Sequence, residues 1–185
     1  MRLSYVGELG WELYAPSEYS HRLWQLLWQA GQKHGIIAGG RGAFDAMRIE
    51  KGYRSWGKDM WTDHDPFEAG LGFAVRLDKD DFIGKKALLK RQKKPQQKLC
   101  TLLFEPAKVI VGNSEPVFKG SKKVVGFVTS ACYSSSLDRG IAYAWLSPNV
   151  ASQGTELSVD YFGERLKVTV GPDTVFDPEM KKMRA

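Results

Sequence analysis

The sequence predicts an α+β protein in which a partly helical region precedes a small antiparallel β-barrel. Two patterns predict this class. Apolar residues recur at helical spacing in two segments of the first half, and short β-rich runs separated by turn residues follow Pro95. The length of 185 residues also allows a buried core without disulfide or metal supports. We place a boundary near residues 92–97, which gives predicted domains at residues 1–94 and 95–185.

The start of the chain reads as a β-hairpin. Two β-rich runs, at residues 3–6 and 11–14, flank a glycine-containing turn at residues 7–10. Because Met1 opens almost inside this hairpin, its outer edge would expose unpaired backbone groups unless another segment covers it. This edge is a first indication that the chain is part of a longer protein.

Two amphipathic helices are predicted after the hairpin. The first begins near Ser17, a suitable N-cap, and its apolar stripe consists of Tyr19, Leu23, Leu26, Leu27 and Ala30. The second spans residues 43–51 and stops at Gly52. Arg48 lies on the apolar side of this second helix, where an unpaired guanidinium would be costly. Either a carboxylate or a ligand must therefore meet Arg48.

The remaining elements are shorter. We expect a strand at residues 70–77 and a short helix at residues 84–92. Five β-rich runs then follow, at residues 98–104, 124–130, 141–146, 155–161 and 165–170. Turn residues separate these runs, which by themselves indicate a small barrel or a sandwich.

The excess of positive charge is confined to one segment. A net charge of +6 arises from 27 Lys and Arg against 21 Asp and Glu. Seven of the basic residues lie between Lys85 and Lys98 with no acid among them, which leaves 20 basic against 21 acidic residues elsewhere. This segment lacks the interleaved aromatics of single-strand binders, so a solvated helix face is favoured over nucleic-acid binding. No apolar run is long enough to span a membrane, and we expect no membrane partner.

Several common site chemistries are disfavoured. Cys100 and Cys132 form no Cys-x-x-Cys pair and have no His at metal-ligand spacing, so we expect buried free thiols in a cytoplasmic protein without a metal site. The Gly-Gly-Arg-Gly loop at residues 39–42 fails the dinucleotide fingerprint, because Asp45 occupies the position of the third glycine. We therefore interpret this loop as a tight turn that precedes a helix, not as a nucleotide-binding loop.

Three residues are the strongest candidates for a ligand site: the aromatic Tyr5, the acidic Glu12 and Arg48, whose guanidinium is expected to be buried. Tryptophans, including Trp56, lie nearby in the sequence. Stacking on an aromatic ring and a bidentate hydrogen bond to a carboxylate would suit a flat heteroaromatic ligand with amide-like edges. An ion pair between Glu12 and Arg48 within the core explains the same residues equally well.

Four motifs point to a family. Their residues are Tyr-Val-Gly-Glu-Leu-Gly-Trp-Glu at 5–12, Arg-Ile-Glu-Lys-Gly-Tyr at 48–53, Pro-Phe-Glu-Ala-Gly-Leu at 66–71 and Phe-Ile-Gly-Lys-Lys-Ala-Leu at 82–88. In this order they resemble the folate-binding aminomethyltransferase family. That family includes the glycine-cleavage T-protein and the C-terminal modules of dimethylglycine and sarcosine dehydrogenases and oxidases. Leu9, Trp11, Lys51 and Trp56 look closer to the flavoenzyme branch.

The resemblance implies a fold, a cofactor and a reaction. The fold is a partial folate-binding α+β domain followed by a small antiparallel β-barrel. Tetrahydrofolate would lie in a central cavity, with its pterin bound by Tyr5 and Glu12, while Arg48 and Trp56 occupy further cofactor-binding positions. Glu8 is a weaker candidate. The implied reaction passes a one-carbon unit from a methylated amine to tetrahydrofolate.

The sequence also departs from the family pattern. The family's key Asp lies before the first motif, so no catalytic residue is assigned here, and no flavin-binding region is present. We therefore expect a partial chain with little activity alone, no FAD on this chain, and folate plus an upstream flavoprotein domain or subunit, or a second copy, as partners. The alternative is a non-catalytic binding or assembly module completed by another subunit or by dimerisation.

Overall fold

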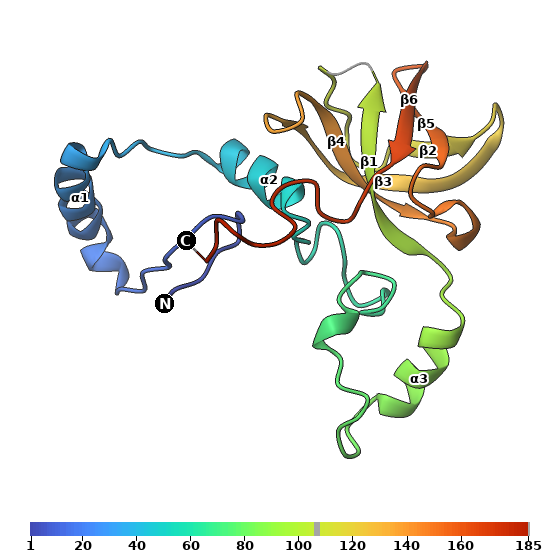
Figure 1. Cartoon of the computed structure of the whole chain (residues 1–185), viewed down its shortest axis with the longest axis horizontal. Helices are drawn as coiled ribbons and strands as arrows, with labels where there is room; N and C mark the ends of the chain where they lie inside the picture. The colour runs from blue at the N-terminus through green and yellow to red at the C-terminus, as the bar shows by residue number, and fades with distance from the viewer. Residues whose placement is uncertain (106–107, 185) are drawn as a thin grey trace.

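The computed structural model describes residues 1–105 and 108–184, and it ends in a closed antiparallel β-barrel (Figure 1). The strand order around the barrel is β1-β4-β3-β2-β5-β6, and every neighbouring pair is antiparallel. Three α-helices lie in the preceding half of the chain. The predicted α+β class with a small antiparallel barrel is confirmed.

The barrel strands are β1 (Lys98–Glu105), β2 (Pro116–Lys119), β3 (Lys123–Ser134), β4 (Arg139–Leu146), β5 (Glu156–Tyr161) and β6 (Glu164–Val170). Closure is made by β1, where Leu102 lies opposite Ala142 of β4 and Val170 of β6. Because the barrel is closed, every strand is hydrogen-bonded to a neighbour on both sides and the sheet has no free edge. The barrel is thus a self-contained support for the elements that dock on it.

The barrel takes part in two hydrophobic clusters. The inner cluster fills its interior with small and branched side chains, including Leu102, Val128 and Val159. The second lies on the outer face and combines barrel residues with residues from the helical half, among them Ile49, Tyr143 and Trp145. From Gly140 to Leu146, every residue of β4 is buried, because its two faces belong to the two clusters. This explains why residues 141–146 read as a continuous apolar run.

The three helices are α1 (Ser20–Gly31), α2 (Arg41–Glu50) and α3 (Lys85–Lys93). Of these, α2 packs on the barrel, against β3 and β4. It ends at Glu50, and two residues later Gly52 has φ of +83°, where an added Cβ would lie 2.7 Å from the carbonyl oxygen of Asp173. Glycine is therefore required both by backbone conformation and by the close approach of the C-terminal segment.

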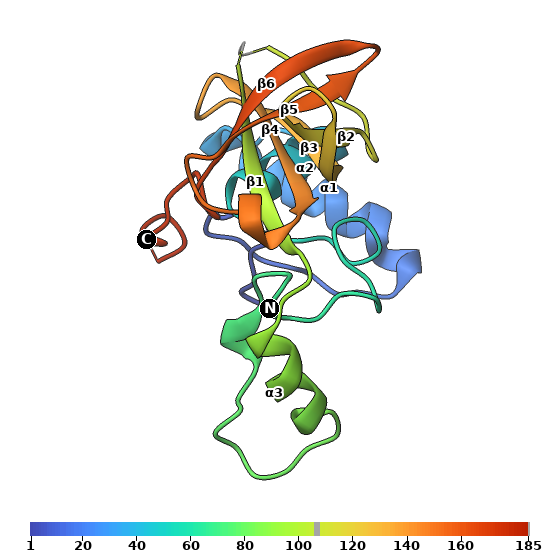
Figure 2. The ribbon, with the colours of Figure 1, turned by 90° about the vertical axis from the view of Figure 1, so that its right-hand side faces the viewer.

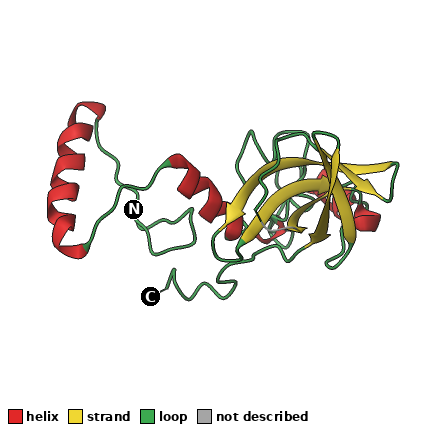
Figure 3. Cartoon of the chain, turned by 90° about the horizontal axis from the view of Figure 1, so that it is seen from above, coloured by secondary structure: helices red, strands yellow, loops and turns green. Residues whose placement is uncertain are grey.

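The other two helices stand apart from the barrel. Figure 2 shows α3 at the end of an extension that points away from the strands, and Figure 3 shows α1 at the opposite end of the molecule from the barrel. Neither α1 nor α3 contains a buried residue. No described helix is both long and apolar enough to cross a membrane.

Two of the predicted segments are wrong. The hairpin at residues 3–6 and 11–14 contains no strand; it is closed by paired backbone groups of Met1 and Glu12, at 2.9 and 2.7 Å. A two-stranded ribbon is marginal without a third strand, and the described residues provide none beside it. Residues 70–77 contain no strand: Gly70, with φ of +73°, ends the turn at residues 66–70, and a short 3₁₀ helix follows at Gly72–Ala74.

One strand was missed, and two of the three predicted helices are confirmed to within two residues of their bounds. The first predicted helix begins three residues later, at Ser20, after a 3₁₀ turn at Ser17–Tyr19, and Ser17 is not its N-cap. The missed strand, β2, has four residues and begins with Pro116, which cannot donate a ladder hydrogen bond. The predicted helix at 43–51 is α2, and that at 84–92 is α3. The five β-rich runs correspond to β1, β3, β4, β5 and β6.

Candidate functional site

A buried ion pair lies where α2 meets the barrel. The Arg48 side chain has no exposed surface, and its guanidinium donates to the Asp59 carboxylate, which is equally buried. Arg48 also donates to Ser130 Oγ at 2.9 Å and to the Tyr53 carbonyl oxygen at 3.1 Å. The guanidinium on the apolar side of the helix is thus met by a carboxylate, one of the two alternatives that its position required.

Asp59 joins three separate segments of the chain. One carboxylate oxygen accepts from the Ser55 backbone N–H at 2.8 Å, and the other accepts from the hydroxyls of Thr129 and Ser130 on β3. Its backbone carbonyl accepts from the Trp145 indole N–H at 2.8 Å. Hydrogen bonds to neighbouring groups offset part of the cost of burying the two charges, whereas removal of either charged side chain would leave the charge of the other buried without its main counter-ion.

A second polar contact fixes the end of α2. Glu50 is buried and accepts from Ser134 Oγ at 2.6 Å and from Ser136 Oγ at 3.0 Å. Close by, the hydroxyl of Tyr143 donates to the Ile49 carbonyl oxygen at 3.0 Å, and burial raises the pKa of Tyr143. Because these contacts come from β3, β4 and the turn between them, α2 is held rigidly on one face of the barrel.

Tyr5 belongs to an aromatic cluster beside this polar network. Its ring stacks on Phe44 with centroids 5.4 Å apart and lies 5.8 Å from the Tyr53 ring. The Tyr5 hydroxyl donates to the Arg54 carbonyl oxygen. Burial raises the pKa of Tyr5, and the positive charge of Arg48 partly opposes this rise. Tyr5 is joined to Arg48 through Tyr53, whose ring lies beside that of Tyr5 and whose carbonyl oxygen accepts from Arg48.

The other two predicted site residues lie apart from this cluster. The Glu12 carboxylate accepts from the Tyr14 hydroxyl, and among the described residues it makes no polar contact with Tyr5 or Arg48. Trp56 is 67% exposed, in a turn that forms an isolated bridge with Met60. Glu12 and Trp56 are thus accessible to solvent, whereas Arg48 is not.

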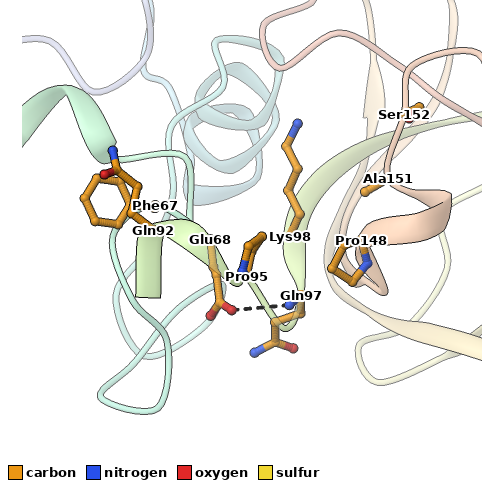
Figure 4. Close-up of a pocket in the computed structure, with 9 residues that line it drawn as sticks. All are labelled: Phe67, Glu68, Gln92, Pro95, Gln97, Lys98, Pro148, Ala151 and Ser152. Atoms are coloured by element: carbon orange, nitrogen blue, oxygen red, sulfur yellow. Dashed lines mark hydrogen bonds between the residues drawn. The ribbon is translucent and has the colours of Figure 1, made fainter. Parts of the chain in front are cut away.

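Two grooves lie nearby, but Tyr5, Glu12, Arg48 and Trp56 line neither of them. One, of about 410 Å³, lies between the N-terminal turn, α2 and the C-terminal segment, and Val6, Met47 and Glu50 help to line it. The other, of about 420 Å³, lies between the chain leading into β1 and the barrel (Figure 4). In it, Glu68 accepts from the backbone N–H groups of Gln96 at 2.6 Å and Gln97 at 3.3 Å. Glu68 therefore fixes the segment that enters the barrel.

Asp59 is the residue that the sequence reasoning missed. The burial of Arg48 on an apolar helix face already required an acidic partner. Asp45 and Asp59 were both near enough in sequence to supply one. The structure gives the main role to Asp59, while Asp45 lies 3.4 Å from the Arg48 Nε and also pairs with Arg41 at 3.0 Å.

The fold and this network define a class: an α+β module in which one helix and the turn after it are fixed to a closed barrel by buried charged groups. Residues 1–79 match the GCVT N-terminal domain, and residues 97–177 match the glycine cleavage T-protein C-terminal barrel domain. The chain belongs to the glycine cleavage T-protein family, and the resemblance read from its motifs is confirmed.

Relatives of two kinds match nearly the whole chain. Mouse mitochondrial dimethylglycine dehydrogenase is 38% identical over 173 residues, which are 92% of this chain and 20% of that protein. An aminomethyltransferase of Desulfitobacterium hafniense is 34% identical over 175 residues, 95% of this chain and 48% of its own length. This chain therefore spans about a fifth of the dehydrogenase and about half of the aminomethyltransferase.

A solved structure shows the same fold. The glycine cleavage system aminomethyltransferase T from Bartonella henselae superposes with a TM-score of 0.84 at 25% identity. The superposition covers 98% of this chain and 49% of that one. The position of α1 far from the barrel is therefore part of a fold that a longer relative shares.

Proposed function

We propose that this chain is a tetrahydrofolate-binding module for one-carbon transfer from a methylated amine. The observation that carries the proposal is the presence of both family domains in order, with the Tyr5 aromatic cluster next to the Arg48 network. The relatives include an aminomethyltransferase and the dimethylglycine and sarcosine dehydrogenases, and their activities support this reaction class.

The described residues fit such a cofactor in part. A bicyclic pterin needs a ring to stack on and a carboxylate for its amide-like edge, which Tyr5 and Glu12 would supply. The half-buried Glu12, whose carboxylate accepts from the Tyr14 hydroxyl, and the exposed Trp56 ring would have to face the ligand. When bound, tetrahydrofolate supplies the acceptor of the one-carbon unit.

Arg48 fits a supporting role better than direct contact. Its guanidinium donates to Asp45, Asp59, Ser130 and Tyr53, and the side chain has no exposed surface. By holding Asp59, it fixes residues 53–60, the segment that carries Trp56. We therefore propose that Arg48 is a positioning residue for the folate site.

The proposal includes two further statements about the whole reaction. We propose little one-carbon transfer by the 185-residue chain alone, since it spans about half of the aminomethyltransferase relatives. Any oxidation of the amine is assigned to a flavin-bearing partner or region, not to this chain. Cytoplasmic localisation stays a prediction, which the buried free thiols favour and the mitochondrial names of several relatives do not.

Titration with folinic acid in a calorimeter tests the proposal. We expect binding, and we expect Glu12→Ala to weaken it about tenfold or more relative to Glu8→Ala, because a carboxylate bonded to the ligand is lost. Glu8 is a matched control, since it is an acid in the same turn that pairs with Lys182 at 3.7 Å. Equal losses in the two variants would show that the assignment of Glu12 is wrong, and no binding by the unaltered chain would favour the assembly alternative.

A further inference from the structure

The C-terminal segment, residues 173–184, runs back from the barrel across the end of α2 to the N-terminal part of the chain (Figure 1). The backbone N–H groups of Val175 and Phe176 both donate to the Glu50 carbonyl oxygen, at 3.0 and 3.1 Å. Residues 178–184 lie beyond the region that matches the barrel domain of the family. The family match therefore does not account for the contacts that these last residues make.

Lys51 is a buried cation between this segment and the N-terminal turn, here defined as residues 5–12. Its side chain is 1% exposed, and its ammonium donates to the carbonyl oxygen of Asp177 and, at 3.3 Å, to the carboxylate of the same residue. The hydrocarbon stem of Lys51 lies against Gly7, where an added Cβ would be 2.6 Å from the Lys51 Cδ. Because a buried ammonium needs its counter-ion, the pair fixes how the turn, the end of α2 and the C-terminal segment lie together.

Asp177 also shapes the segment to which it belongs. Its carboxylate accepts from the backbone N–H groups of Lys181 at 2.9 Å and Lys182 at 3.0 Å. One carboxylate thus closes the last turn of the segment and binds Lys51 at the same time. Hydrogen bonds to a charged acceptor are stronger than bonds between neutral groups, so the fold of the segment depends on Asp177.

The last turn of the segment brings two residues to the N-terminal part of the chain. The Met183 carbonyl oxygen accepts from Arg2 at 3.2 Å, and the Met183 sulfur accepts from the Tyr53 hydroxyl at 3.3 Å. The Lys182 ammonium lies 3.7 Å from the Glu8 carboxylate, and this exposed pair contributes little by itself. The segment therefore contacts both the N-terminal turn and the aromatic cluster of the candidate site.

The N-terminal turn has little packing of its own. Among residues 1–12, Gly7 alone is buried, and no strand forms there. The position of the turn on α2 is set at Tyr5, by stacking in the aromatic cluster, and at Gly7, by the Lys51 side chain. Because Gly7 lies between Tyr5 and Glu12 in the sequence, the contact with Lys51 affects how both of them would face a ligand.

We propose that Lys51 and Asp177 are positioning residues of the folate site, a role that rests on the proposed function. Their buried pair fixes the turn that presents Tyr5 and Glu12. Loss of the pair would let the turn and the C-terminal segment move independently, while the barrel stays folded around its own core. Since the coupling between two sites is reciprocal, a ligand bound by Tyr5 and Glu12 would in turn stabilise the C-terminal segment.

The variant Lys51→Met tests this role, because it keeps an apolar stem against Gly7 and removes the ammonium. Without any ligand, we expect the hydrogen-bonded amides of Glu12, Lys181 and Lys182 to exchange about tenfold faster than in the unaltered chain, with the exchange of barrel amides unchanged. Titration with folinic acid in a calorimeter should give a Kd about tenfold higher.

Two further variants complete the comparison. Asp177→Asn removes the charge on the other side of the pair, at a side chain that is 10% exposed, and it should have the same effects even where Lys51→Met does not fold. Lys181→Met is the matched control. It removes an ammonium from the same segment, but this ammonium is on a 77% exposed side chain and pairs with Glu179, so neither the exchange rates nor the Kd should change.

The reciprocal measurement distinguishes positioning from a purely structural pair. In the unaltered chain, saturating folinic acid should slow the exchange of the Lys181 and Lys182 amides about tenfold. Three results would overturn the role given to Lys51: an unchanged exchange rate of the Glu12 amide in Lys51→Met, an equal Kd for the two chains, or no effect of folinic acid on the segment. If the unaltered chain binds no folinic acid, the proposed function fails, whereas the exchange of the Glu12 amide without ligand still decides whether Lys51 fixes the turn.

Discussion

Replacement of Asp59 by Asn removes one charge from the buried pair without changing the side-chain volume. Both side chains of the pair are fully enclosed, so the Arg48 guanidinium would keep its charge with no exposed surface and with only the more distant Asp45 carboxylate, 3.4 Å from its Nε, as an acidic partner. The donors at Ser55, Thr129 and Ser130 would also lose a carboxylate acceptor. Breaking a buried pair in this way costs about 3–5 kcal/mol, a large share of the about 5–15 kcal/mol that stabilises a typical domain.

Urea denaturation followed by tryptophan fluorescence measures this loss. The probe is apt because the Trp145 indole donates to the Asp59 carbonyl oxygen. With a slope of about 2 kcal/mol per molar urea, the midpoint of Asp59→Asn should fall by about 2 M. Asp78→Asn is the control, since Asp78 also pairs with an arginine, Arg76 at 2.9 Å, but on the surface, and its midpoint should not move. If the two variants had the same midpoint, the structural role given to the buried pair would be refuted.

Three further predictions follow from burial and backbone geometry. Burial raises the pKa of Cys100 to about 11 and that of Cys132 to about 12, so both thiols should react with iodoacetamide at pH 8.5 far more slowly in the native chain than in urea; equal rates would contradict this. Burial lowers the pKa of His64 in the folded chain, so the stability that neutral His64 allows is present above the unfolded pKa of about 6.5 and is lost as pH falls below that value. This loss, measured by chemical denaturation at several pH values, should be smaller in His64→Gln. Identical pH profiles of the variant and the unaltered chain would contradict the role given to His64. Gly52→Ala should lower the free energy of unfolding by more than about 1 kcal/mol, because φ of +83° and the Asp173 carbonyl both oppose a Cβ; an unchanged thermal midpoint would count against this.

Local patterns in the sequence predicted most of the fold. The helix predicted at residues 43–51 lies within two residues of the bounds of α2, and five of the six barrel strands follow from β-rich runs bounded by turn residues. The segment at 70–77 looks like a strand because many of its residues are apolar, yet the left-handed Gly70 ends a turn and a 3₁₀ helix follows it. An apolar pattern indicates which residues are buried, but it does not indicate the backbone conformation in which they are buried.

The site was harder to predict, for a different reason. The sequence required a partner for Arg48 and could not choose between a carboxylate and a ligand. The answer depends on Ser130, which is 82 residues away, and on Asp59, which reaches back across a turn. Contacts of this separation follow from the docking of α2 on the barrel, a tertiary event that no local pattern encodes. The roles of Tyr5, Glu12 and Trp56 toward folate remain predictions.

Strand β4 carries an unusual constraint on sequence change. In most strands of an antiparallel sheet, one face meets water and every second position tolerates many residue types. From Gly140 to Leu146 neither face of β4 is free, because one fills the barrel and the other receives Ile49 and the α2 segment. A polar replacement at any of these positions therefore has no route to solvent. The strand has to satisfy two cores at once, so variation in this family should be least free along a segment that contains no proposed ligand contact.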